Sequence, residues 1–358
     1  NHRLDIAYTG NWNKSCSNSQ TTGSSVSRAH NDSHAYLHNV DVNYSLPFGL
    51  TLGGSYTYYR TPQQQWLDGT MQVNANTTET KRNLTSSNEQ TINKWMFTAD
   101  QTHSLAHGWG VSYGVKGQFA SNKSYQSTLD KKGNILPNAT SNVDINERIW
   151  NMYAGFSKQV NKAISFEASV AAEQYHSPMW DKWRIYPTLN ALWSINDNHL
   201  LNLSFNSNSV FPSYWSTMSN VFYSSTYTEI HGNPDLKPYS YYNVNLMWQI
   251  KRRYTLSAFA NLEPDYSVQM PYQTADRMAV IMKETNFDYS NRFGLQASVI
   301  FSAGKWLNGN VFVAGTYKHD KSSRFFDLPF NRKKLSAILG GTASVKLCEE
   351  KIQKICIF

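Results

Sequence analysis

Residues 242–250 read YNVNLMWQI, with an apolar side chain at every second position and mostly amides between them. The same alternation returns in residues 50–58 and 335–347. Successive side chains of a β-strand point to opposite faces, so a period of two indicates strands with one apolar and one polar face. The sequence therefore predicts an all-β protein.

This alternation predicts roughly fourteen antiparallel strands in up-and-down order. The strands are expected near residues 3–12, 35–46, 50–60, 92–103, 109–120, 147–158, 163–174, 184–195, 199–208, 240–250, 253–264, 287–302, 308–319 and 335–347. A ten-residue strand tilted by roughly 45° rises about 23 Å, close to the apolar band of about 25 Å on transmembrane barrels.

The predicted connections alternate between short turns and long loops. The short turns are residues 46–49, 106–108, 159–162, 195–198, 251–252 and 303–305. The loops are residues 13–34, 61–91, 121–146, 209–239, 265–286 and 320–334, with a shorter one at 175–183. Short turns at one end and long loops at the other are typical of a barrel that threads up and down through a membrane. Loops of this length usually carry function or disorder.

The predicted size of the sheet decides which face meets lipid. So many strands enclose a space that side chains cannot fill, so the apolar face is expected to point outward. Tyr242, Val244, Leu246 and Trp248 should then face lipid, and Asn243 and Asn245 should face the lumen. The prediction is an antiparallel transmembrane β-barrel, present here in part.

The composition is compatible with this interpretation. The chain is 40% hydrophobic, 14% aromatic and 16% charged, with a mean hydropathy of −0.53. No apolar run approaches the 18 or more residues of a transmembrane helix, whereas the strands of a membrane barrel need no such run. Abundant aromatic residues fit the girdles at membrane interfaces. Composition alone would fit an aromatic-rich soluble β-sandwich equally well.

The net charge of +8 does not indicate a nucleic-acid partner. The basic residues are scattered, their densest groups are residues 251–253 and 332–334, and no base-reading motif accompanies them. The three cysteines form neither a disulfide framework nor a metal-ligand pattern. No catalytic, cofactor-binding or metal-ligating set is expected, and the chain is not predicted to be an enzyme.

Two groups of residues are candidates for function. The first is the motif GNPDLKP, formed by Gly232, Asn233, Pro234, Asp235, Leu236, Lys237 and Pro238. Glycine and asparagine permit positive φ and proline fixes φ, so the motif predicts a rigid turn into the next strand. The second group comprises aromatic residues of the predicted loops: Trp66, Tyr214, Trp215, Tyr223 and Tyr227. They could stack on a sugar or an aromatic chelator, or pack on one another at the rim.

The stretch from residue 185, IYPTLNALWSINDNHLLNLSFNSNSVFPSYWSTM, followed by GNPDLKP, resembles the outer-membrane β-barrel domain of TonB-dependent receptors. The resemblance extends to about residue 346. It departs from the family at Tyr239, where a glutamate is usual, and near residues 209–212, where an arginine is missing. Receptors of this family close 22 strands around a plug.

The resemblance implies an outer-membrane receptor for energy-coupled uptake of a siderophore, cobalamin or glycan. The implied partners are outer-membrane lipid, a plug domain upstream of this chain, and a periplasmic TonB-type protein that contacts a segment not included here. Residues 1–347 would then be the C-terminal portion of a larger barrel. Residues 348–358 break the alternation and are interpreted as an atypical, truncated tail. With part of the barrel missing, the strands are expected to form an open curved sheet or a smaller closed barrel.

Three other classes remain open at this point. One is a passive or structural outer-membrane barrel without transport coupling. Another is an outer-membrane hydrolase, and the last is a soluble secreted β-protein.

Overall fold

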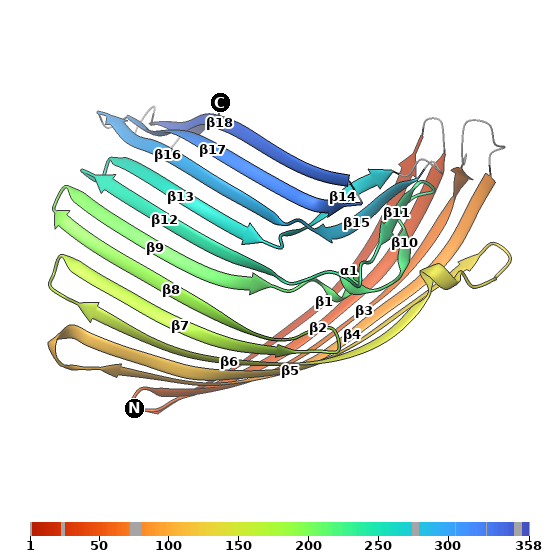
Figure 1. The fold of residues 1–358 in the computed structure, drawn as a ribbon, viewed down its shortest axis with the longest axis horizontal. Coiled ribbons are helices and arrows are strands. Elements are labelled where there is room, and N and C mark those ends of the chain that lie inside the picture. Colours follow the sequence, from red (N-terminus) through yellow and green to blue (C-terminus); the bar gives the residue numbers. More distant parts are fainter. Residues whose placement is uncertain are drawn as a thin grey trace.

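Most of the chain forms one large sheet of fifteen strands (Figure 1). The computed structural model describes residues 2–22, 26–71, 80–273, 279–304, 306–326, 328–346 and 353–357. The strands of the large sheet are β1 Arg3–Thr21, β2 Ser27–Ser45, β3 Leu50–Met71, β4 Thr80–Ser104, β5 Trp109–Asp130, β6 Ser141–Gln159, β7 Ile164–His176, β8 Asp181–Asn196, β9 His199–Val210, β12 Tyr239–Ile250, β13 Tyr254–Pro264, β16 Tyr289–Ala303, β17 Leu307–Phe325, β18 Leu328–Lys346 and β19 Gln353–Ile357.

The large sheet is antiparallel throughout, and its strands follow one another in chain order. Each of the fourteen predicted strands has its counterpart in this sheet, and β19 is an additional strand beside β18. The division into residues 1–347 and 348–358 stays a prediction. Within the described residues, no helix combines the length and the hydropathy needed to span a membrane.

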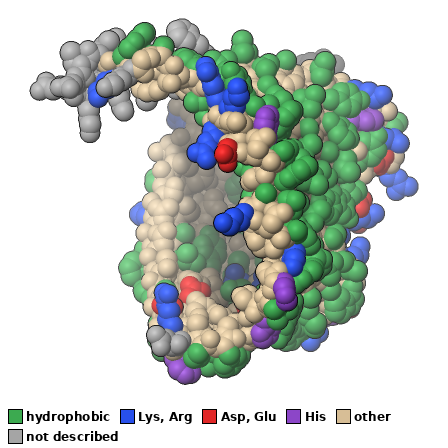
Figure 2. Space-filling view, turned by 90° about the vertical axis from the view of Figure 1, so that its left-hand side faces the viewer, with side chains coloured by type: hydrophobic (Ala, Val, Ile, Leu, Met, Phe, Trp, Pro, Cys, Tyr) green, Lys and Arg blue, Asp and Glu red, His purple; other side chains and the backbone are tan. Residues whose placement is uncertain are grey.

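The large sheet curves around a hollow and remains open (Figures 1 and 2). In the part of the chain that the structure describes, β1 pairs with β2 alone, and no ladder joins it to β18 or β19. An open curved sheet is one of the two expected outcomes.

The outer face is apolar and the hollow is polar, as predicted. Val244, Leu246 and Trp248 expose 38, 41 and 38% of their surface, whereas the neighbouring Asn243 and Asn245 are half-buried. Tyr242, expected on the same outer face, is half-buried as well. Figure 2 shows hydrophobic side chains crowding the outer wall and mainly other side chains and backbone lining the hollow. Lipid, in place of a protein core, is the environment that matches this outer face.

The prediction of long loops is wrong for most connections. The ranges 13–34, 61–91, 121–146 and 320–334 lie largely within strands, and β4 alone has 25 residues. A transmembrane strand needs about 9–11 residues, so these strands run well beyond the apolar band. Outside that band a strand needs no apolar face, because neighbouring strands satisfy its backbone. The alternation of apolar residues therefore marks only the part of each strand inside the apolar band, and the rest of the strand was taken for a loop.

The short turns gather at one end of the sheet, at the left in Figure 1. Positive φ angles at Gly49, Gly108 and Gly304 and at Lys251 and Arg252 reverse the chain there. The two connections that remain long, 211–238 and the described parts of 265–288 (265–273 and 279–288), leave from the opposite end. The two ends therefore differ as predicted.

These two long connections build a second, four-stranded sheet, called here the inserted sheet. Its strands are β10 Val221–Tyr223, β11 Thr228–His231, β14 Ser267–Gln273 and β15 Val280–Asn286, and the four-residue helix α1 Tyr214–Thr217 precedes them. The order is β10-β11-β15-β14, and the central pair β11–β15 is parallel. This parallel pair joins the two connections to each other.

The inserted sheet reaches across the hollow to the inner face of β3, β4 and β5 (Figure 1). Gln65 donates a hydrogen bond to the carbonyl of Tyr223 at 3.0 Å, and Gln126 donates to that of Val221 at 2.9 Å. Arg82 donates to the carbonyl of Thr226 at 3.2 Å. Each of these bonds spans about a hundred residues of sequence or more, so the contact is entirely tertiary.

Candidate ligand-binding site

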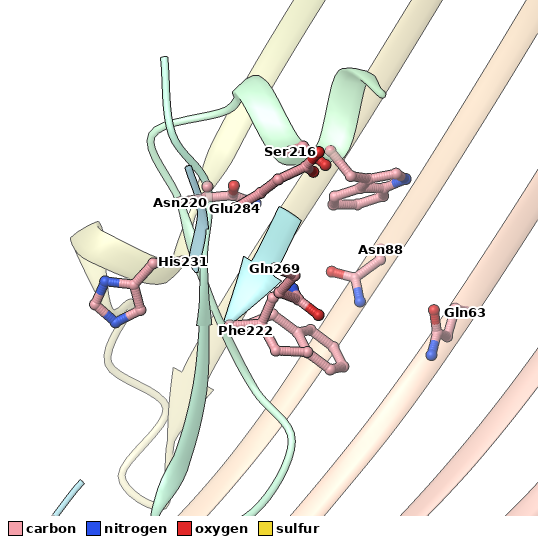
Figure 3. Close-up of a pocket in the computed structure, with 11 residues that line it drawn as sticks. Gln63, Asn88, Ser216, Asn220, Phe222, His231, Gln269 and Glu284 are labelled. Carbon is pink, nitrogen blue, oxygen red and sulfur yellow. The ribbon is translucent and has the colours of Figure 1, made fainter. Parts of the chain in front are cut away.

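A cavity of about 360 Å³ lies between the wall formed by β3 and β4 and the inserted sheet with α1 (Figure 3). Figure 3 shows Gln63 and Asn88 from the wall facing Gln269 and Phe222 of the inserted sheet. The residues that line the cavity are Gln63, Asn88, Trp215, Ser216, Asn220, Phe222, Ile230, His231, Gly232, Gln269 and Glu284.

The wall beneath the inserted sheet is polar yet buried. Gln65, Asn88 and Gln126 expose 3, 6 and 1% of their surface. Asn122, fully buried, accepts a hydrogen bond from Gln90 at 3.0 Å. The Oδ1 atom of Asn88 has no hydrogen-bond partner among the described residues. An unpaired buried acceptor is costly, so this atom is suited to receive a donor from a ligand.

A small apolar cluster holds β10 of the inserted sheet against β2, β3 and β4. Ala29, Leu67 and Leu84 are buried together, and Tyr223 of β10 packs against them. The guanidinium of Arg82 lies over the Tyr223 ring, 4.7 Å from its centroid. Burial of the ring and the cation–π contact both favour the docked position of β10.

An ion pair strengthens the same attachment. Glu229 of β11 is 2% exposed in its side chain, and its Oε1 lies 3.6 Å from Nη1 of Arg82. Its Oε2 lies 2.8 Å from Nε2 of His231. A buried carboxylate needs such partners, because desolvation disfavours its charge. Arg82 thus connects β4 to both β10 and β11.

The GNPDLKP motif follows β11 and contacts several elements at once. A Cβ atom at Gly232 would lie 1.6 Å from the carbonyl oxygen of Met218, so only glycine fits there. Neither Gly232 nor Asn233 adopts a positive φ, so the conformational reason given from the sequence is wrong and close packing replaces it. Asn233 donates through Nδ2 to the carbonyl of Glu284 at 2.9 Å.

The second half of the motif is tied to the other long connection. Leu236 is 1% exposed. The backbone N–H of Lys237 donates to Oδ1 of Asn286 at 2.8 Å, and Nδ2 of Asn286 donates back to the Lys237 carbonyl at 2.9 Å. Arg184 of β8 donates to the carbonyl of Pro238 at 3.1 Å. Pro234 and Asp235 lie in the turn between these contacts.

The structure does not bring the five aromatic candidates together. Trp215 lines the cavity. Tyr214, its neighbour on α1, instead makes a hydrogen bond to Glu147. Burial, and secondly this hydrogen bond, raise the pKa of the Tyr214 phenol above its ordinary value. Tyr223 packs on the wall, and Tyr227 lies in the turn between β10 and β11 with its carbonyl accepting from Val280 at 2.7 Å.

Trp66 is the candidate that lies farthest from its expected location, since it belongs to the large sheet. It lies within β3 rather than in a loop, and 41% of its surface is exposed. Its sequence neighbours Gln65 and Leu67 are buried on the inner face, so Trp66 is on the opposite, outer face. Its ring lies 5.3 Å from that of His30 on β2.

The amides of the cavity were missed by sequence reasoning. Gln63 and Asn88 fall in ranges that were expected to be loops, although Gln63, Gln65 and Leu67 keep a period of two on one face. That period was the available signal. Gln269 and Glu284 had no signal, because their position depends on the pairing of β14 with β15 and of β15 with β11. Over the described residues, no cluster of three or more His, Cys, Asp or Glu side chains could hold a metal ion.

Comparison with known proteins gave one family match and several structures of similar shape. Residues 49–350 match the sequence profile of the outer membrane protein beta-barrel family. The RagAB peptide importer in its "open-open" state is similar in structure at a TM-score of 0.52 and 14% identity, over 84% of this chain and 37% of that chain. The siderophore receptor PirA from Pseudomonas aeruginosa gives a TM-score of 0.49 and 12% identity, over 97% of this chain and 75% of that chain. No curated protein matches the sequence.

Proposed function

The chain belongs to the outer membrane protein beta-barrel family, and we propose that it is the barrel of a receptor that takes up a scarce nutrient by energy-coupled transport. The protein is located in the outer membrane. The nutrient would be of the siderophore, cobalamin or glycan class. The energy would come from a periplasmic TonB-type protein, and a plug domain would be encoded upstream. Both partners are implied by the resemblance of the GNPDLKP region to TonB-dependent receptors.

One observation carries the proposal: two connections fold back into the hollow as an ordered sheet and leave a lined cavity against the wall. A wide, unobstructed pore is not compatible with this arrangement. A receptor needs a concave, largely preformed site reached from the loop end. The inserted sheet supplies such a site.

The GNPDLKP motif is given a positioning role in this proposal. Gly232 allows the chain to pass close to Met218, and Lys237 is paired with Asn286 of the other connection. The motif would therefore hold the two connections together and fix the inserted sheet, while the cavity is formed by other residues.

Uptake with and without the coupling protein tests the proposal. The gene that encodes this chain is deleted from its host, and uptake of a labelled ferric siderophore, cobalamin and an oligosaccharide mixture is measured. Loss of one uptake activity, with the same loss when the energy-coupling protein is deleted, is expected. Uptake that persists without the coupling protein, together with a steady conductance in planar bilayers, would show a passive barrel instead.

A further inference from the structure

We propose that the cavity between β3, β4 and the inserted sheet binds an uncharged, hydroxyl-rich ring compound, such as a sugar unit of an oligosaccharide. The inference rests on the proposed function as a receptor and narrows its substrate class. The cavity, at about 360 Å³, is at the small end of the roughly 300–1,000 Å³ found for small-molecule sites. It is suited to a short segment of such a ligand.

The polar lining matches hydroxyl groups. Gln63, Asn88 and Gln269 carry side-chain amides, each of which both donates and accepts hydrogen bonds. A sugar hydroxyl has the same dual character. Asn88 is 6% exposed, and its Oδ1 lacks a partner among the described residues, so a hydroxyl donor would satisfy it. Figure 3 shows the Asn88 side chain directed at the inserted sheet across the cavity.

Two aromatic side chains supply apolar surface beside these amides. Trp215 of α1 and Phe222 of β10 both line the cavity. Aromatic rings pack well against flat apolar surface, such as the C–H face of a sugar ring. Aromatic faces combined with amides thus match both sides of a hydroxylated ring.

The charges at the cavity argue against an anionic ligand. Its titratable lining groups are His231 and Glu284, and no Lys or Arg is among the described residues that line it. His231 is already bonded to Glu229, and Glu284 accepts from Ser267 at 2.7 Å. Anionic chelators and phosphates are normally bound by Arg or Lys, which here are absent from the lining. A carboxylate, by contrast, readily accepts hydrogen bonds from hydroxyl groups.

Addition of a peptide as a further strand is disfavoured at the β10 edge of the inserted sheet. The outer edge of the inserted sheet at β10 is occupied, because the carbonyls of Val221 and Tyr223 accept from Gln126 and Gln65. Strand addition depends on free backbone groups at an edge. The amide and aromatic lining of the cavity, rather than the sheet edges, is what favours the sugar.

Binding to the purified full-length protein in detergent tests the inference. Titrations monitored by calorimetry would use maltohexaose, cellohexaose and xylohexaose as neutral probes, with a ferric catecholate siderophore and a neutral hexapeptide as competitors. Trp215→Ala, Asn88→Ala and Gln63→Ala should each weaken oligosaccharide binding by about tenfold, the usual effect of removing a buried partner.

Two matched variants serve as controls. Gln64→Ala alters the exposed neighbour of Gln63 on the outer face, and Trp183→Ala removes a tryptophan that is 63% exposed. Both should bind as the unaltered protein does, and heat-modifiable mobility would show that all variants are folded. Failure of every oligosaccharide to bind, equal effects of Gln63→Ala and Gln64→Ala, or binding of only the siderophore or the peptide would overturn the inference.

This test is independent of transport. Oligosaccharide binding without energy-coupled uptake would refute the proposed function and leave the sugar site intact. Coupled uptake of a siderophore alone would refute the sugar site and leave the receptor function intact.

Discussion

The large sheet and the inserted sheet differ in how their strands find one another. In the large sheet, strands that follow in the chain lie side by side, and every pair is antiparallel. In the inserted sheet, β11 and β15 are separated by about fifty residues and pair in parallel. The first arrangement needs only turns, whereas the second needs a scaffold that is already in place.

The two sheets are also stabilised by different interactions. An outer face such as that of Val244, Leu246 and Trp248 is matched by lipid, which requires apolar residues in strict alternation. The inserted sheet is instead held by side-chain hydrogen bonds, an ion pair and a cation–π contact to the wall. Substitutions that affect one sheet should therefore leave the other largely unchanged.

A charge on the lipid-facing surface should have the largest effect and should act on the large sheet. Val244→Arg is expected to destabilise folding into vesicles by about 2–4 kcal/mol, the usual penalty for Arg deep in the bilayer. Asn245→Arg, one residue away and facing the hollow, is the control and should fold nearly normally. Urea titration of folding in lipid measures both. Equal destabilisation would mean that the two faces are not distinct.

Removal of Arg82 should loosen the inserted sheet and spare the large one. Arg82→Met breaks the pairing with buried Glu229 and the bond to the Thr226 carbonyl, at a cost of about 1.5–3 kcal/mol. Hydrogen exchange of β10 and β11 amides should accelerate accordingly. Arg60→Met is the control, because the Arg60–Glu89 pair is solvent-exposed and such pairs contribute about 0–1 kcal/mol.

A second substitution sharpens this prediction. Glu229→Gln combined with Arg82→Met removes the buried charge that has lost its Arg82 partner, so protection should partly return. If the double variant exchanges as fast as Arg82→Met alone, the ion pair is not what holds β11.

A methyl group at Gly232 should displace the junction between the motif and α1. Gly232→Ala places Cβ against the Met218 carbonyl, and overpacking of this kind costs about 1–3 kcal/mol. Limited proteolysis within residues 211–238 should become faster. Gly315→Ala on β17 is the control, because nothing lies within 4 Å of its added Cβ. Equal cleavage of the two variants would count against a tightly packed motif.

Alkaline pH should have the smallest effect and should act through Tyr214. Because the pKa of its phenol is raised in the folded protein, the unfolded chain loses this proton first as pH rises above about 10. Stability should then fall by at most about 1.4 kcal/mol per pH unit from this residue. Tyr214→Phe should remove that part of the dependence. A Tyr214→Phe protein with an unchanged alkaline profile would contradict it.

The strands and their faces could be predicted because lipid imposes a local pattern. Residues 242–250 carry the alternation wherever they are read, and the outward position of Val244 followed from it. The extension of β3 through Trp66 was missed, since beyond the apolar band polar residues such as Gln63 and Gln65 give a weaker signal. The aromatic candidates were chosen because they were expected to lie in loops, whereas Trp66 lies in β3 and Tyr223 in β10.

By itself, the sequence determined the all-β class, the fourteen antiparallel strands, the outward apolar face and the end at which long connections lie. Tertiary structure alone decided the inserted sheet, the parallel pairing of β11 with β15, the cavity, and the reason for glycine at position 232. The physical reason is the distance along the sequence over which each constraint acts. Contact with lipid constrains every second residue along a strand, whereas Gln63, Asn88, Trp215 and Glu284 meet only after distant segments have packed together.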